Sequence, residues 1–204
     1  MDQYQTISAT TEEVLFKEKG SKFYCKAFVM TRADELSELI AERQLAHPKA
    51  GHHCYAYRLG PNGEKYRAND DGEPANTAGA PILGQLQAAE VTNVLVVVTR
   101  IFGGTKLGVG GLIQAYREGA KQALSAARIV KRLIEVPITV QVSYPQLGTV
   151  LRLIEQHEGR IVQMDQQEDC IVRALVRKSS YDRLKSDLAN IYPISFLDED
   201  AATA

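Results

Sequence analysis

The spacing of hydrophobic residues changes several times along the chain, and each change predicts a different kind of element. Between Tyr4 and Met30, β-branched and aromatic residues surround a turn at Gly20–Ser21, which predicts two or three strands. Apolar residues then recur at helical spacing, and Thr31 is expected to cap that helix. A strand is predicted over 53–59, with a turn and a return strand over 65–68 after it.

The middle of the chain centres on a continuous apolar run, Val94–Val98. Such a short run predicts a strand that is covered on both faces. A helix is expected before it, over about residues 80–89, with Thr77 as a candidate cap. A longer amphipathic helix is expected after it, over about residues 110–128.

The pattern becomes strictly alternating after Arg132. Residues 134–142 predict a strand with one buried face, in which Pro137 is expected to face an unpaired edge or solvent. Ser143 and Gln146 form a capping box at the start of the helix that follows. The remaining elements are two strands over about 161–164 and 170–177, a helix, and a strand over 193–197.

The order of these last elements, βαββαβ, is the split-βαβ, ferredoxin-like arrangement. The chain is therefore predicted to be an α+β protein with two domains, residues 1–132 and residues 133–204. Residues 198–204 are expected to form a short frayed tail.

Composition excludes several classes of protein. The formal net charge of −1 argues against a protein that coats nucleic acid through bulk charge, although it leaves room for a local basic face. Cys25, Cys54 and Cys170 are too few and too far apart for a disulfide scaffold or a four-cysteine zinc site. The N-terminus has no apolar signal segment, and the longest apolar run is far too short to span a bilayer. The sequence therefore predicts a cytoplasmic protein without membrane association.

The first candidate for a functional segment is the glycine-rich stretch 100–111, RIFGGTKLGVGG, between the buried strand and the long helix. Free N–H groups and the positive end of the helix can bind an anion there. A Walker loop and a GxGxxG fingerprint both fail, because Val109 and Ile113 stand where these motifs need other residues. A tight turn with close helix packing is the alternative interpretation. The candidate binding residues of this segment are Arg100, Gly103, Gly104, Thr105, Lys106, Gly108 and Gly110.

The second candidate is an acidic loop over residues 70–79. Asp70, Asp71 and Glu73 could hold Mg²⁺ or act as a general base, or they could cap backbone N–H groups in a turn. The lack of a second acidic cluster favours the turn, and Thr77 completes the candidate binding residues of this loop.

Two further groups of polar residues precede that loop. Lys22 lies in a lysine-rich first hairpin and is a candidate for contact with RNA phosphates. His52, His53 and Cys54 are adjacent on a strand, so their side chains alternate between its two sides and a metal site is not expected.

Five short motifs follow one another along the chain: Gly20–Phe23, His53–Tyr57, Asp70–Pro74, Thr77–Gly79 and Arg100–Gly108. Together they resemble the Impact family, and the whole chain is similar to the bacterial, YigZ-type members of that family. The resemblance implies an N-terminal domain similar to the second domain of ribosomal protein S5. It also implies a C-terminal domain similar to the fifth domain of translocation factor G.

Eukaryotic members of the family act in translational control and carry an additional N-terminal RWD domain. This chain is expected to have no room for that domain. The role of the eukaryotic members in regulating a kinase is therefore not carried over to this chain. The resemblance implies instead a partner among RNA, ribosomes and translation factors, with no cofactor and no classical catalysis. The expected binding groove lies between the acidic loop and the glycine-rich segment. Two alternatives stay open: a phosphate-handling enzyme with Mg²⁺ on the acidic loop, and a protein–protein adaptor.

Overall fold

The computed structural model describes residues 2–166 and 169–197, which form a mixed α+β protein. The chain divides into two compact units. One contains Tyr4–Arg132, and the other begins at Leu133 and also includes Asp2 and Gln3. The predicted domains differ from these units in the placement of the first three residues. The tail expected over 198–204 lies outside the described residues.

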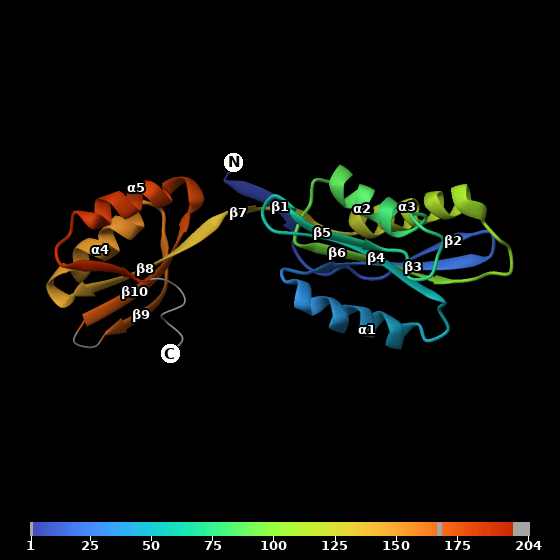
Figure 1. Ribbon diagram of the computed structural model, residues 1–204, viewed down its shortest axis with the longest axis horizontal. Helices are drawn as coiled ribbons and strands as arrows, with labels where there is room; N and C mark the ends of the chain where they lie inside the picture. The colour runs from blue at the N-terminus through green and yellow to red at the C-terminus, as the bar shows by residue number, and fades with distance from the viewer. Residues whose placement is uncertain (1, 167–168, 198–204) are drawn as a thin grey trace. The chain divides into compact units, whose positions relative to one another are not determined.

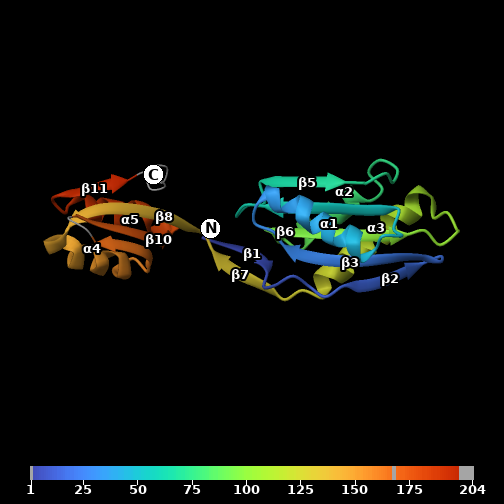
Figure 2. The ribbon, with the colours of Figure 1, turned by 90° about the horizontal axis from the view of Figure 1, so that it is seen from below.

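A five-stranded antiparallel sheet forms the centre of the first unit. β6 is the middle strand, and β2 and β5 are the two edges (Figure 2). All of β6 except Ile101 is buried, as the apolar run predicts for a strand covered on both faces. In sheet order the strands are β2 (Val14–Glu18), β3 (Ser21–Val29), β6 (Val94–Ile101), β4 (His52–Leu59) and β5 (Lys65–Asn69).

Helices cover both faces of this sheet (Figure 1). α1 (Leu36–Ala46) lies on one face, and α2 (Gly79–Ala88) and α3 (Gly108–Ser125) lie on the other. A 3-10 turn (Ala33–Glu35) precedes α1 and has Arg32 at its N-cap, so the predicted Thr31 cap is wrong.

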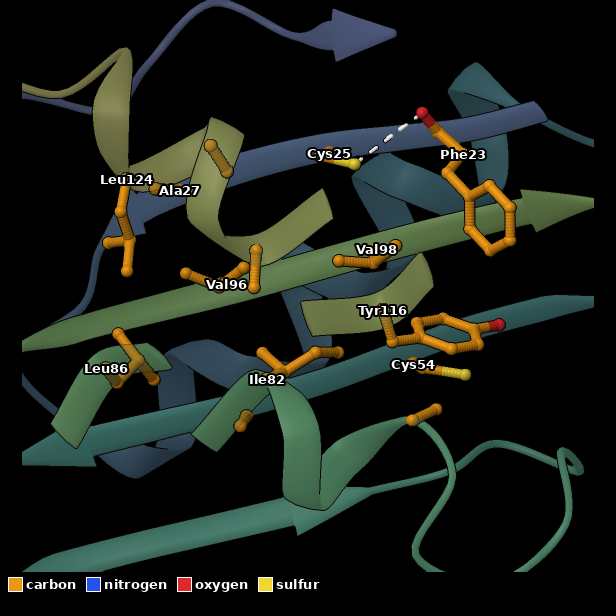
Figure 3. Close-up of a cluster of buried hydrophobic side chains, with 14 of the residues drawn as sticks. Phe23, Cys25, Ala27, Cys54, Ile82, Leu86, Val96, Val98, Tyr116 and Leu124 are labelled. Carbon is orange, nitrogen blue, oxygen red and sulfur yellow. Dashed lines mark hydrogen bonds between the residues drawn. The ribbon is translucent and has the colours of Figure 1, made fainter. Parts of the chain in front are cut away.

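Two apolar layers hold the helices to the sheet. The layer under α2 and α3 contains Phe23, Ile82 and Tyr116 (Figure 3). Gly119 lets α3 approach closely, since a Cβ there would lie 2.8 Å from the Cys25 sulfur. The layer under α1 is smaller and includes Phe28, Met30, Tyr55, Leu59, Leu95 and Val97.

Two short strands, β1 (Gln3–Ile7) and β7 (Ile129–Leu133), form a separate two-stranded sheet. The sequence pattern does not predict β7. Its residues, IVKRL, are exposed or half-buried and do not alternate between apolar and polar. The pairing with β1 brings the two ends of the first unit together.

The second unit has the predicted βαββαβ order. Its antiparallel sheet has the strand order β11-β8-β10-β9, and α4 and α5 lie on one face of it (Figure 1). Pro137 is exposed, in agreement with the prediction that it faces an unpaired edge or solvent. The elements are β8 (Glu135–Ser143), α4 (Tyr144–Gln156), β9 (Arg160–Gln166), β10 (Asp169–Arg177), α5 (Lys178–Ala189) and β11 (Ile194–Leu197).

Helix capping in this unit differs from the prediction. Ser143 is the N-cap of α4, but its side chain makes no capping hydrogen bond, so the predicted capping box is wrong. The first turn of α5 is bonded by Asp2 instead, which accepts from the Ser179 N–H at 3.0 Å and from the Ser179 hydroxyl.

Candidate functional site

The glycine-rich segment and the acidic loop meet at one end of the five-stranded sheet. Arg100 lies near the end of β6, and its Nη1 donates to Oε1 of Glu73 over 2.6 Å. Arg100 is only 5% exposed and Glu73 only 9%, so a buried ion pair joins the two candidate segments. Figure 3 shows the ring of Tyr116 of α3 beside Cys54 of β4.

Further polar side chains converge on this pair from three elements. The Tyr116 hydroxyl donates to the same Glu73 oxygen over 2.8 Å, and His52 Nε2 lies 3.9 Å from it. On the other side, Arg100 Nη2 donates to the Ser21 hydroxyl oxygen over 3.3 Å. We call these five residues the Arg100 cluster. Its members come from β3, β4, β6, α3 and the acidic loop.

Arg100 differs from the sequence expectation in one respect. It was expected to offer its charge to a ligand at the loop, but Glu73 and Ser21 already bind its two terminal nitrogens. Its guanidinium carbon lies 5.6 Å from the ring centroids of both Phe23 and Phe102. Among the residues that the structure describes, Arg100 Nε has no hydrogen-bond partner. Arg100 therefore holds the loop in place and retains one uncommitted donor.

Burial controls the protonation of the groups beside Glu73. It raises the pKa of the Tyr116 hydroxyl well above its ordinary value. Burial likewise raises the pKa of the Cys54 thiol, whose Sγ donates to the Asp70 carbonyl over 2.9 Å. Both groups therefore stay protonated and serve as hydrogen-bond donors rather than as nucleophiles.

The acidic loop acts mainly as a cap. The two Asp70 carboxylate oxygens accept from the N–H groups of Asn76, Ala78 and Gly79 at 2.8–2.9 Å. Asp70 thus closes the first turn of α2, and the predicted Thr77 cap is wrong, because the Thr77 hydroxyl donates to the Pro74 carbonyl instead.

Asp71 fixes the start of β4. Its carboxylate accepts from the His53 N–H over 2.6 Å, and its carbonyl lies 2.7 Å from His52 Nδ1. A carbonyl only accepts, so Nδ1 carries the proton and Nε2 of neutral His52 is an acceptor. His53 points the other way, toward Thr99. Over residues 2–166 and 169–197, no three His, Cys, Asp or Glu side chains are grouped so that they could hold a metal ion.

The glycine-rich loop is open to solvent. Its candidate residues Gly103, Gly104, Thr105 and Lys106 are all exposed, as are Gly108 and Gly110 in the first turn of α3. Leu107 is the N-cap of α3 and makes no capping hydrogen bond, and over residues 2–166 and 169–197 no other side chain caps this end. The amides of the first helical turn therefore remain available to something outside the protein.

The first hairpin packs directly against this loop. A Cβ on Gly103 would lie 1.9 Å from the carbonyl carbon of Gly20, so only glycine fits there. The Gly103 N–H also donates to the Ser21 hydroxyl oxygen over 3.3 Å. Lys22, exposed on β3, is in register with Ile101, one residue before the loop. The structure thus brings Lys22 and Lys106 to the same end of the sheet.

Sequence reasoning missed several residues of this site. Phe102 is 55% exposed and Val109 is 60% exposed, and both stand out as apolar side chains within a loop of glycines. Tyr116 fits the apolar repeat of α3, which hides the role of its hydroxyl. The missed contacts all join residues that are far apart in the sequence.

Fold and site together define a class of protein. It is an α+β chain of two units, with an exposed glycine-rich loop next to the buried Arg100–Glu73 ion pair. The family model described as the Impact N-terminal domain matches residues 19–124. The chain belongs to the IMPACT family. No helix among the described residues has both the length and the apolar character that crossing a membrane requires.

Relatives and a solved structure extend the similarity beyond that domain. The IMPACT family member YigZ of Escherichia coli (strain K12) is 31% identical over 186 residues, which is 90% of this chain and 91% of that protein. The IMPACT family member YvyE of Bacillus subtilis (strain 168) is 36% identical over 150 residues, or 74% of this chain and 69% of that protein. A crystal structure of a hypothetical protein has a TM-score of 0.74 and 29% identity, and covers 98% of this chain and 99% of that one.

Proposed function

We propose that this chain is a cytoplasmic, translation-associated protein that binds RNA or the ribosome without classical catalysis. The observation that carries the proposal is the open glycine loop, residues 102–111, whose helix-start amides have no capping side chain in the part of the chain that the structure describes. Backbone N–H groups at a helix start favour anions, and a loop without side chains lets a phosphate backbone approach closely.

Charge supports RNA as the ligand. Lys19 and Lys22 are exposed on the hairpin that packs against the loop, and Lys106 is exposed within it. Lysines in this arrangement neutralise phosphates, which supplies most of the affinity of a nucleic-acid-binding surface. A local basic face of this kind is compatible with a net charge of −1.

The fold assignments belong to the same proposal. The βαββαβ order and the β11-β8-β10-β9 sheet favour a ferredoxin-like second unit, similar to the fifth domain of translocation factor G. The first unit is proposed to be similar to the second domain of ribosomal protein S5. Both similarities are to translation proteins, and family resemblance points the same way, which is support by analogy for the process rather than for the site.

The site favours binding over Mg²⁺-dependent phosphate chemistry. Magnesium sites use carboxylate oxygens that are free to coordinate. Here these carboxylates already have partners. Both Asp70 oxygens accept from backbone N–H groups, Asp71 accepts from His53, and Glu73 is paired with Arg100.

A salt titration with matched variants tests the proposal. Binding of fluorescently labelled tRNA and ribosomal RNA is measured at about 50 mM and about 200 mM salt. Affinity is expected to fall steeply with salt, and Lys22→Ala with Lys106→Ala together reduces the log–log slope by about 2, one for each phosphate contact.

Lys65→Ala is the control, because Lys65 is exposed at the opposite end of β5 from the acidic loop. It is expected to leave the slope unchanged. Absence of binding to both RNAs, together with absence of co-sedimentation with ribosomes, overturns the proposal. If Lys65→Ala lowers the affinity as much as the Lys22→Ala and Lys106→Ala changes do, the binding site lies elsewhere.

A further inference from the structure

Phe102 is the feature of the glycine loop that phosphate binding leaves unexplained. The side chain is 55% exposed at the first position of the loop, directly after β6. A single exposed phenylalanine is common on a protein surface and needs no explanation by itself. The groups around the ring are what point to a use.

The Phe102 ring lies next to the cation of Arg100. The Arg100 guanidinium carbon lies over the Phe102 ring, 5.6 Å from its centroid. Glu73 and Ser21 hold that guanidinium in place. Arg100 is only 5% exposed, and its Nε has no hydrogen-bond partner among the described residues.

The neighbouring residues leave the ring approachable. Gly103 and Gly104 follow it, and a Cβ on Gly104 would meet nothing within 4 Å. A flat ligand can therefore reach the ring without meeting a side chain from the next two residues. Lys22 is in register with Ile101, one residue before Phe102, and Lys106 is four residues after it, so the segments next to Phe102 supply two exposed lysines.

We propose that Phe102 is a stacking platform for an unpaired base, and that the loop therefore takes single-stranded RNA rather than a duplex. The inference rests on the proposed function and names its ligand more narrowly. In a duplex each base is already stacked on its neighbours, and only backbone and groove edges reach the protein. An aromatic ring with lysines beside it is the combination that binds single strands.

The test compares two RNAs and a set of Phe102 variants by fluorescence anisotropy. One RNA is a short oligouridine, and the other is a blunt duplex of similar length. Wild type is expected to prefer the oligouridine. Phe102→Ala weakens that binding about 5- to 150-fold, the loss of one stacked base, and leaves weak duplex binding unchanged.

Further variants separate stacking from folding and from charge. Phe102→Trp keeps an aromatic face and retains or improves affinity. Phe102→Leu keeps an apolar side chain over Arg100 without the face, so it loses affinity even if the alanine variant is unstable. Tyr66→Ala is the matched control, since Tyr66 is an exposed aromatic on β5 of the same unit, and it leaves binding unchanged.

The outcomes distinguish the two proposals. Equal binding of duplex and oligouridine, with no effect of Phe102→Ala or Phe102→Leu, overturns base stacking and leaves RNA binding by the loop intact. If Phe102→Leu keeps the full affinity for the oligouridine, base stacking is also overturned, because an apolar contact is then enough. Failure of both RNAs to bind the wild-type protein overturns base stacking, and the tRNA, ribosomal RNA and ribosome measurements decide the proposed function separately.

Discussion

Glu73 accepts hydrogen bonds from Arg100 and Tyr116 through a single oxygen and lies in a region with little access to water. Removing one partner of a buried pair leaves the other charge without compensation, which destabilises more than the intact pair stabilises. The same contact fixes the acidic loop to the end of β6. Stability of the fold and placement of the glycine loop therefore depend on the same carboxylate.

Glu73→Ala is expected to lower the free energy of unfolding by about 3–5 kcal/mol, because Arg100 is left buried and unpaired. Urea unfolding measures the effect, with the exposed Glu12→Ala as the control. A double variant with Arg100→Met and Glu73→Leu is expected to recover most of the loss, since the uncompensated charge is gone. A loss below about 1 kcal/mol in Glu73→Ala, the range of an exposed pair, contradicts this account.

Gly103 and Gly110 are both exposed in the loop but differ in what surrounds them. A Cβ on Gly103 would overlap the backbone of Gly20, whereas a Cβ on Gly110 would meet nothing within 4 Å. Gly103→Ala is therefore expected to destabilise the protein by about 1–3 kcal/mol through overpacking. Gly110→Ala, within α3, is expected to be neutral or to stabilise it by up to about 1 kcal/mol. Thermal unfolding of the two variants side by side measures this, and equal destabilisation argues against the hairpin–loop contact.

Two helices begin without a cap from their own first residues. Asp70 caps α2 across a tight loop, and Asp2 bonds the first turn of α5 from 177 positions away in the sequence. A carboxylate placed at a helix start also interacts favourably with the helix dipole. The start of each helix therefore depends on a segment outside it.

Asp2→Ala is expected to loosen the first turn of α5, seen as faster hydrogen exchange at the Ser179 amide. The hydrogen bond from the Ser179 hydroxyl lowers the pKa of Asp2 below its ordinary value of 3.8. A lowered pKa means that the stabilisation is complete above pH 3.8 and disappears as the pH falls through the folded-state value. The difference between wild type and variant is thus expected at neutral pH and to vanish in stronger acid.

Asp182→Ala is the control for this experiment, because Asp182 is exposed on the same helix. If the Ser179 amide of the Asp2→Ala variant exchanges its hydrogen at the wild-type rate at neutral pH, Asp2 is not the cap.

Elements whose apolar residues recur at a regular spacing were predictable from the sequence, and the other elements were not. The apolar run of β6 and the repeats of α3 and α4 reflect the faces that they bury, so their kind and order follow from local sequence. β7 has no such pattern, because it pairs with β1 in a sheet that buries little of it. The caps at Thr31 and Thr77 and the capping box of Ser143 were predicted wrongly because several nearby polar groups compete for the same N–H groups.

Each of the two units has an apolar core built from its own residues. The clusters around Tyr116 and around Leu95 lie entirely within Tyr4–Arg132, and the cluster around Val172 lies entirely after Leu133. A segment with its own core is able to fold alone. We propose that the domain boundary lies near residue 132, with Asp2 and Gln3 assigned to the second unit.

The segment 4–132, produced alone, is expected to give the far-ultraviolet circular dichroism and dispersed amide spectrum of a folded domain. The segment 133–204 is expected to fold as well, but with a frayed start of α5, because Asp2 is missing. A disordered 4–132 segment contradicts the proposed boundary.

Local patterning was enough to establish two α+β parts, the βαββαβ order of the second and an exposed glycine-rich loop before a long helix. These features depend on which residues face water, a property that repeats along a few consecutive turns or strand positions. The convergence of Glu73 with Arg100, 27 residues apart, was decided only when the strands paired and the helices packed. Spacing along a chain constrains neighbours within an element, whereas contacts between elements depend on how their buried faces fit together.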